Sequence, residues 1–279
     1  MKILIVLIRW KGGVGRLIES LKPFLEKEGH QVEVISREDD LKGFSTKQSF
    51  FKLRKLVKSK KYDILYTQDW SCALPLLLFK NHYCCFCGNE IKGIQKLLQF
   101  CIGNIFGKKL IVVGPQLKKR FKKSNLIYAG VDLSIFKNFN NKREKNTVGF
   151  ANWHRNLYNY SKIKSATKQA GLKLIDTNLK LSKKDLVKFY NKIEIFISLP
   201  EKFAGFNISW IEAMACGVPK IIGNQNGIGN QLDINHVEDF KDILDSLKNA
   251  KSTKEYKINK EFNWDFYSKK LLKVFNENN

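Results

Sequence analysis

Residues 199–230 read LPEKFAGFNISWIEAMACGVPKIIGNQNGIGN, and the order of loops and apolar runs in this stretch predicts the fold. A turn-rich segment leads into an apolar helical run, which Gly217 and Pro219 end as glycine and proline usually end helices. Asn207 or Ser209 is placed to cap its start. A short strand at 220–223 and a second glycine loop follow. This order is typical of an open α/β sheet, where backbone N–H groups and the helix dipole favour a bound anion.

One carboxylate, Glu212, stands inside the apolar helical run. Spacing alone permits two interpretations of this side chain. It is either a ligand-binding carboxylate in an anion-binding crevice or a solvent-facing side chain of a buried βαβ unit.

The segments GFNISWIEAMACGVPKII and NGIGNQL resemble the donor-site signature of retaining glycosyltransferases of the GT4 family. That signature reads loosely E-G-F-G-x-x-x-x-E-A-M-A-C-G-x-P-V-V, followed by G-G-x-x-E. The matching positions are Gly205, Phe206, Glu212, Ala213, Met214, Ala215, Cys216, Gly217 and Pro219. The resemblance implies an α/β protein of GT-B architecture, with two Rossmann-like domains whose parallel sheets face a central cleft. It also implies a UDP- or GDP-linked sugar as co-substrate, retention of the anomeric configuration and no metal.

The sequence departs from the family pattern in the loop before the helix. The family pairs two glutamates eight positions apart, and Ala204 stands where the first one is expected. Glu201, three residues earlier, is the nearest carboxylate and is predicted to take the catalytic, sugar-facing role. Asn230 replaces the glutamate of the later loop. On the same resemblance Glu212 holds the donor ribose, while Gly205, Phe206 and Asn207 contact the sugar and diphosphate.

The expected diphosphate clamp is also altered. The family places Gly-Arg and a later lysine after the first strand of the second domain, and this chain has Ala151-Asn152 there. Arg155, with Lys162 behind it, is predicted to bind the phosphates, because an arginine fork suits two phosphate oxygens. A solvated basic face is the alternative.

The first half of the chain opens like a Rossmann fold. The apolar run 2–8 predicts a buried parallel strand, and the loop KGGVG at 11–15 leads into a helix. Read with the resemblance, Gly12 and Gly13 approach the donor phosphates. Asp69 follows a predicted strand and is a catalytic candidate, because residues at the carboxyl ends of parallel strands line the crevice; the alternative is a helix cap. Cys87 stands where the family often has a histidine.

The predicted domains follow from these segments. Residues 1–137 form a Rossmann-like acceptor domain, residues 147–261 a Rossmann-like donor domain, and residues 262–279 a helix that crosses back to the first domain. The polar segment 137–146 is predicted to be the linker between the two domains.

The formal net charge of +24 predicts attraction to polyanions; a codon bias toward lysine is the alternative explanation. The chain has no helix-turn-helix, RNP or zinc-finger pattern, which argues against a nucleic-acid binder. Basic segments at 50–61 and 116–123 favour peripheral docking on an anionic membrane surface. There the protein would meet a glycan, lipid-linked or protein acceptor.

The six cysteines lack the spacing of a zinc site and predict reduced, buried thiols. The apolar start of the chain is too short for a signal peptide, so we expect a cytoplasmic protein, peripheral on the inner membrane face if it docks. The predicted activity is hexosyl transfer from a nucleotide sugar. The main alternative is a degenerate GT-B protein that binds nucleotide sugar without turnover, since Ala204, Asn152 and Cys87 depart from the family.

Overall fold

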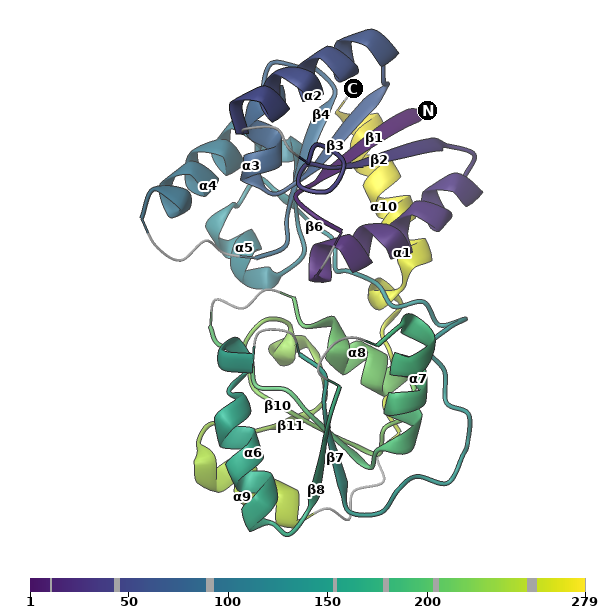
Figure 1. The fold of residues 1–279 in the computed structure, drawn as a ribbon, viewed down its shortest axis with the longest axis vertical. Helices are drawn as coiled ribbons and strands as arrows, with labels where there is room; N and C mark the ends of the chain where they lie inside the picture. Colours follow the sequence, from purple (N-terminus) through teal and green to yellow (C-terminus); the bar gives the residue numbers. More distant parts are fainter. Residues whose placement is uncertain are drawn as a thin grey trace. The chain divides into compact units, whose positions relative to one another are not determined.

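The computed structural model describes residues 1–10, 12–42, 46–88, 93–152, 155–177, 181–202, 206–249 and 255–278. The chain divides into two compact units (Figure 1). The first unit is Met1–Ala129 together with Trp264–Asn279, and the second is Gly130–Asn263. Each contains one sheet in which every strand pairing is parallel. The prediction of two Rossmann-like α/β domains is thereby confirmed.

The first unit is built on a six-stranded sheet in the order β2-β1-β3-β4-β5-β6. Its strands are β1 (Lys2–Leu7), β2 (Gln31–Ser36), β3 (Ile64–Gln68), β4 (His82–Phe86), β5 (Leu110–Val112) and β6 (Asn125–Leu126). Its helices are α1 (Gly13–Lys27), α2 (Thr46–Lys60), α3 (Trp70–Ala73), α4 (Gly93–Phe106), α5 (Pro115–Arg120) and α10 (Trp264–Glu277). Two short 3-10 helices, η1 (Leu74–Leu76) and η2 (Gly107–Lys109), complete it.

Alternate side chains of these strands pack against different helices, because successive residues of a strand point to opposite faces. Cys84 and Phe86 of β4 belong to an apolar cluster with α3, α4 and α5. On the other face, the hydroxyls of Tyr66 and Tyr267 share a hydrogen bond of 2.8 Å, and Tyr83 donates to the carbonyl of Phe275. The last helix of the chain is therefore part of the core of the first unit.

The second unit has a five-stranded sheet in the order β11-β10-β9-β7-β8. Its strands are β7 (Thr147–Phe150), β8 (Lys173–Asp176), β9 (Ile195–Ile197), β10 (Lys220–Gly223) and β11 (Asn235–His236). Its helices are α6 (Tyr160–Gln169), α7 (Lys183–Lys192), α8 (Ile208–Ala215) and α9 (Phe240–Lys248), with the 3-10 helices η3 (Arg155–Tyr158), η4 (Gly229–Gln231) and η5 (Lys260–Phe262). Residues of α6 and α9 share one apolar cluster with the sheet. On the opposite face, a Cβ added at Gly149 would lie 2.3 Å from Ile193, so α7 and its end pack closely on β7.

Helix α8 ends as the sequence predicts. Gly217 adopts a φ of 67°, which L side chains rarely adopt, and its N–H donates to the carbonyl of Met214 at 2.9 Å. A Cβ at Gly217 would also lie 2.6 Å from the side chain of Asn138. Position 217 therefore requires glycine for both conformation and packing.

The predicted linker at 137–146 is instead packed into the second unit. The guanidinium of Arg143 donates to four backbone carbonyls, those of Tyr190, Ile193, Cys216 and Gly217, at 2.6–2.9 Å. Burial lowers the pKa of Arg143 from its ordinary value. The segment has no apolar periodicity, but one arginine can satisfy carbonyls that the ends of α7 and α8 leave without helical partners.

Candidate functional site

Four polar side chains meet where β7 and β9 end and α8 begins in the second unit. Asn152 follows β7, Ser198 follows β9, and Asn207 and Ser209 stand at the start of α8. We call these four residues the edge network. All of them are buried, with at most 8% of the residue exposed. They lie at the carboxyl edge of a parallel sheet, which is where open α/β proteins bind ligands.

The edge network is held by direct hydrogen bonds. Ser198 Oγ donates to Asn152 Oδ1 at 2.7 Å and accepts from Asn207 Nδ2 at 2.9 Å. Asn207 Oδ1 accepts from Ser209 Oγ at 2.6 Å and from Asn152 Nδ2 at 3.2 Å. Because both ends of the Asn207 amide are used in this way, the orientations of the side chains are tightly coupled.

The start of α8 is not capped by a side chain as the sequence suggests. Asn207 occupies the N-cap position, but its side chain makes no capping hydrogen bond to the helix. The amide is turned into the edge network instead. The first-turn N–H groups of α8, at the positive end of the helix dipole, therefore receive no side-chain cap from Asn207. Such a position suits an anion.

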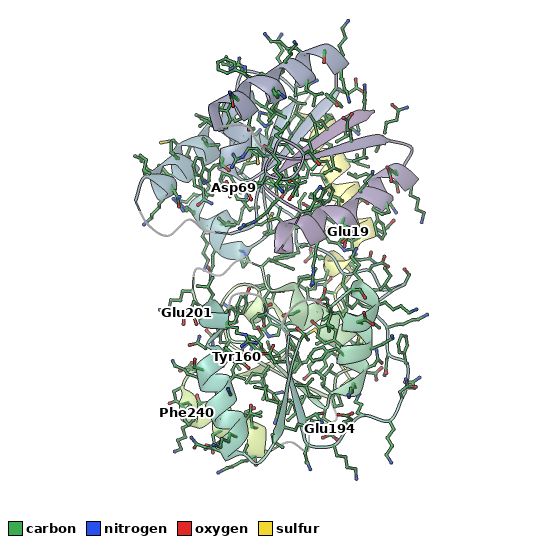
Figure 2. The ribbon with its side chains drawn as sticks, in the orientation of Figure 1. Glu19, Asp69, Tyr160, Glu194, Glu201 and Phe240 are labelled. Carbon is green, nitrogen blue, oxygen red and sulfur yellow. The ribbon has the colours of Figure 1, made fainter. Side chains whose placement is uncertain are left out.

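Glu201 lies in the second unit, half-buried, beside the start of α6 (Figure 2). Asn159 Nδ2 donates to Glu201 Oε1 at 2.9 Å and to the carbonyl of Leu199 at 3.0 Å. The preceding carbonyl, that of Pro200, accepts from the side-chain amides of Asn224 and Asn226. The loop that carries Glu201 is thus fixed to two neighbouring loops of the same sheet edge. Gly205, a predicted contact of the sugar and diphosphate, and Ala204 lie outside the described residues.

Arg155, a predicted phosphate ligand, is engaged within the second unit. Its guanidinium forms an ion pair with Asp176, at the end of β8, and stacks over the ring of Tyr160 at 4.4 Å. The side chain is 43% exposed, so its charge remains accessible. Lys162 lies exposed in the first turn of α6.

Glu212 is buried in α8, so its interpretation as a solvent-facing side chain is wrong. Only 8% of the residue is exposed, and Oε2 accepts a hydrogen bond of 2.9 Å from the hydroxyl of Tyr190 in α7. A buried carboxylate is costly unless hydrogen bonds stabilise it. Phe206, the next predicted contact, lies half-buried with its ring 6.3 Å from that of Phe262.

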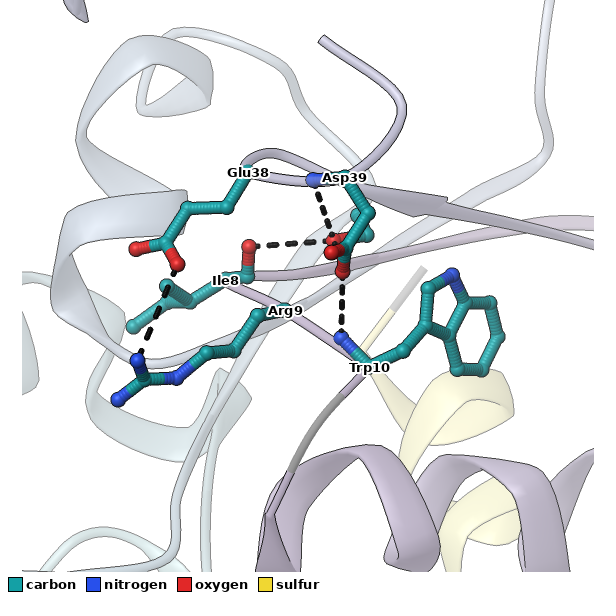
Figure 3. A network of polar contacts seen from close by, with 6 residues as sticks. Ile8, Arg9, Trp10, Glu38 and Asp39 are labelled. Carbon is teal, nitrogen blue, oxygen red and sulfur yellow. Dashed lines mark hydrogen bonds and ion pairs between the residues drawn. The ribbon is translucent and has the colours of Figure 1, made fainter. Parts of the chain in front are cut away.

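In the first unit, Gly12 and Gly13 lie at the start of α1. Gly12 is the N-cap residue with a φ of 101°, and Gly13 is exposed. The backbone just before them is held in place by Asp39, whose Oδ2 accepts from Trp10 N at 2.7 Å (Figure 3). Asp39 Oδ2 also accepts from Ser36 Oγ at 2.6 Å. The loop after β1 is therefore fixed to the end of β2.

Asp69 follows β3 and caps α3, as one of the two interpretations predicts (Figure 2). Its Oδ1 accepts from Ser71 N at 3.0 Å. The backbone of Asp69 has a φ of 81° and a ψ of 153°, a region that is essentially restricted to glycine and costs about 1–3 kcal/mol. Strain of this kind at the carboxyl edge of a sheet is common at functional sites, and a catalytic role for Asp69 stays a prediction.

Cys87 lies just after β4 and donates to Gln68 Oε1 at 3.5 Å. The hydrogen bond that Cys87 shares with Cys85, together with burial, raises the pKa of the Cys87 thiol well above its ordinary value. Burial also raises the pKa of Cys72 and Cys216 to about 12. The six cysteines form no disulfide, and these three thiols are protonated at neutral pH.

Ser198 is a site residue that the sequence analysis did not single out, and Ser209 was considered there only as a possible helix cap. The available signal was weak. Each is a single hydroxyl residue beside an apolar run, and only the adjacency of β7 and β9 brings them to Asn152. Among the described residues, no cluster of three or more His, Cys, Asp or Glu side chains is arranged to hold a metal ion. No helix in the described part of the chain has the length and apolar content to cross a bilayer.

The topology of the two units defines the GT-B class, and solved structures of that class match nearly the whole chain. Sucrose-phosphate synthase from Thermosynechococcus elongatus matches with a TM-score of 0.76 at 14% identity, covering 99% of both chains. The lipopolysaccharide outer core galactosyltransferase WaaB matches at 0.68 and 12%, again over 99% of both. UDP-GlcNAc 2-epimerase from Methanocaldococcus jannaschii matches at 0.64 and 10%, over 99% of this chain and 100% of that one. At these identities the likeness shows the fold alone.

The family is indicated by the sequence itself. Residues 108–238, from η2 to just beyond β11, match the model of the family described as Glycosyl transferases group 1. This match confirms the resemblance read from the motif at 205–219 and covers all four residues of the edge network. A comparison with curated proteins gave no significant match.

Proposed function

We propose that the protein is a retaining, GT4-like hexosyltransferase that moves a sugar from a nucleotide sugar to an acceptor. The edge network carries the proposal. It is a buried set of amides and hydroxyls beside the start of α8, inside the segment that matches the glycosyltransferase family.

In this proposal the donor diphosphate lies at the start of α8. The positive end of the helix dipole attracts it, and the buried polar groups of the edge network fix the backbone around it. Asn152 stands where the family has arginine, so a neutral amide replaces a cation at that point. Arg155 and Lys162 supply positive charge from η3 and α6. Helix N–H groups and cationic side chains then stabilise the departing nucleoside diphosphate without a metal.

The remaining roles follow the family resemblance. Glu212 binds the hydroxyls of the donor ribose, and the backbone from Gly205 to Asn207, with Phe206, contacts the sugar and diphosphate. Glu201 supplies the sugar-facing carboxylate that is missing at Ala204, and the hydrogen bond from Asn159 holds it in place.

The first unit supplies the acceptor side in this proposal. Following the family resemblance, Gly12 and Gly13 are substrate-binding residues of this unit, and Asp69 is a catalytic residue. The acceptor is a glycan, a lipid-linked compound or a protein; nucleic acid is not expected. The protein is cytoplasmic in this proposal, and its charge favours an acceptor held at an anionic membrane surface.

A panel of UDP-, GDP- and ADP-sugars tests the proposal, with thermal stabilisation as the measure of binding and donor hydrolysis as the measure of turnover. Glu212→Gln should weaken nucleotide affinity by about one to two decades, because a charge-assisted hydrogen bond to the ribose is lost. The variant should keep its fold, since the glutamine can still accept from Tyr190. Glu238→Gln, an exposed carboxylate of the same unit, is the matched control.

The outcomes distinguish a glycosyltransferase from a protein that binds nucleotide sugar without turnover. If no nucleotide sugar stabilises the wild type, or if Glu212→Gln binds as tightly as Glu238→Gln, the donor site is elsewhere. If donors bind but neither hydrolysis nor transfer occurs, the protein is the degenerate binder. If Glu201→Gln abolishes hydrolysis while donor affinity is kept, the catalytic role of Glu201 is supported; unchanged turnover contradicts it.

A further inference from the structure

Helix α4 carries apolar side chains on two of its faces. One face, formed by Gln99, Ile102, Gly103 and Phe106, is buried against the first unit. The other face carries a second apolar stripe at helical spacing, and we call it the exposed stripe: Ile94, Leu97, Phe100, Cys101 and Ile105. Ile94 and Ile105 are 65% and 66% exposed, and Leu97 is 55% exposed. A contiguous exposed apolar surface of this kind marks an interaction site.

The segment of sequence that contains α4 and α5 is basic. Residues 91–131 contain no Asp or Glu, but they contain nine basic residues: Lys92, Lys96, Lys108, Lys109, Lys118, Lys119, Arg120, Lys122 and Lys123. Arg120 is fixed beside the stripe, because its guanidinium lies 5.7 Å from the ring centre of Phe100 and donates to the carbonyl of Lys96 at 3.1 Å. A second bond of 3.1 Å goes to Gln99 Oε1.

This combination favours a lipid surface over other partners. A helix with an apolar face and flanking cations lies in the plane of a bilayer, with its apolar side chains in the acyl boundary and its cations near lipid phosphates. Nucleic acid would leave the isoleucine and leucine side chains of the stripe unburied. A second copy of the chain would bring two basic surfaces together, which like-charge repulsion opposes.

We propose that α4 is an interfacial helix that docks the first unit on an anionic lipid bilayer. The exposed stripe enters the bilayer surface, and Lys96 and Arg120 contact the anionic headgroups. Helix α4 lies beside α3 and α5 in the first unit (Figure 1). The contact is therefore distinct from the basic helix α2, and it does not require sugar transfer.

Cys101 provides a direct test, because it is the one exposed thiol among the six cysteines of the chain. An environment-sensitive fluorophore attached to Cys101 should shift its emission to the blue when phosphatidylcholine–phosphatidylglycerol vesicles are added. Pure phosphatidylcholine vesicles should produce little shift. High salt should reverse the shift, because the Debye length falls from about 10 Å at 0.1 M to about 3 Å at 1 M.

Three outcomes of the labelling experiment would overturn the proposal. The first is no binding to anionic vesicles, and the second is binding that leaves the Cys101 label in water. The third is a blue shift that depends on protein concentration without vesicles and accompanies a dimer in sedimentation, since a second copy of the chain would then cover the stripe.

A variant tests the same helix without a label. Ile94→Ser/Leu97→Ser/Ile105→Ser should lower the vesicle partition coefficient by about 100-fold, since each buried apolar side chain contributes about fivefold at the interface. Leu133→Ser, an apolar residue of the second unit that is 43% exposed, is the matched control and should change it by less than about twofold. Equal losses in both proteins, or no loss in the triple variant, would contradict docking through α4. Circular dichroism checks that each variant is folded.

Discussion

Replacing Arg143 by alanine is expected to destabilise the second unit more than any change of a neighbouring charge. The guanidinium donates to the carbonyl of Tyr190 in the last turn of α7 and to that of Ile193 just after it, at 2.6 and 2.9 Å. It also donates to the carbonyls of Cys216 and Gly217 just after α8, at 2.7 and 2.8 Å. Alanine at this position leaves these four carbonyls without the donors that now satisfy them. The two helices also lose the side chain that joins their ends.

The magnitude follows from the number of bonds and from their exposure. A hydrogen bond to a charged group contributes about 1.5–3 kcal/mol, and water recovers part of this once a half-buried side chain is removed. A net loss of about 3 kcal/mol in the free energy of unfolding is therefore expected. Arg143→Lys should recover part of this loss, because an ammonium has three donors in place of the planar fork of five.

The measurement must report the second unit by itself, because two units can unfold in separate transitions. Hydrogen exchange of the α7 and α8 amides under native conditions does this. Lys142→Ala is the control, since Lys142 is exposed in the same segment. If Arg143→Ala changes the exchange free energy by no more than Lys142→Ala, the four bonds contribute nothing and the segment 137–146 is a simple linker.

Two further changes test the core of the first unit. Burial lowers the pKa of His82 from 6.5 to about 4, so below pH 6.5 the unfolded chain binds a proton that the folded protein does not. The free energy of unfolding should be highest above pH 6.5 and fall by about 3 kcal/mol as the pH decreases to 4. In denaturation experiments, His82→Leu should show a weaker dependence of this free energy on pH. His236→Gln, a change at an exposed histidine, should keep the wild-type dependence. Gly103→Ala places a Cβ 2.4 Å from the ring of Phe121 and should cost about 1–3 kcal/mol in thermal denaturation, while Gly88→Ala, with open space, should be nearly neutral.

The architecture of each unit was readable from short segments. The run KILIVL is β1, and Gly217 ends α8 where its φ of 67° requires glycine. The sequence Ser182-Lys183-Lys184-Asp185 resembles a capping box, and α7 begins there. These features depend on neighbours within a few residues, such as the cap in which Ser182 Oγ accepts from Asp185 N. The motif at 205–219 indicated the protein family in the same way, because its residues are contiguous in sequence.

Other features were decided by tertiary structure. The apolar residues of α4 form two stripes, and periodicity does not say which stripe the core takes; packing of Gly103 against Phe121 decides it. The sequence permitted both a helix cap and a site residue at Asp69, and only the conformation after β3 shows that it caps α3.

The sequence by itself determined several helices and strands, the class of fold and the family of the segment around α8, because local patterns and a contiguous motif record these directly. The tertiary structure decided which distant side chains meet. Asn152 joins Ser198 and Asn207 because β7 pairs with β9, and Arg143 joins α7 to α8 because both helices end beside it. Such contacts depend on strand order and on helix ends tens of residues away, which no local pattern contains.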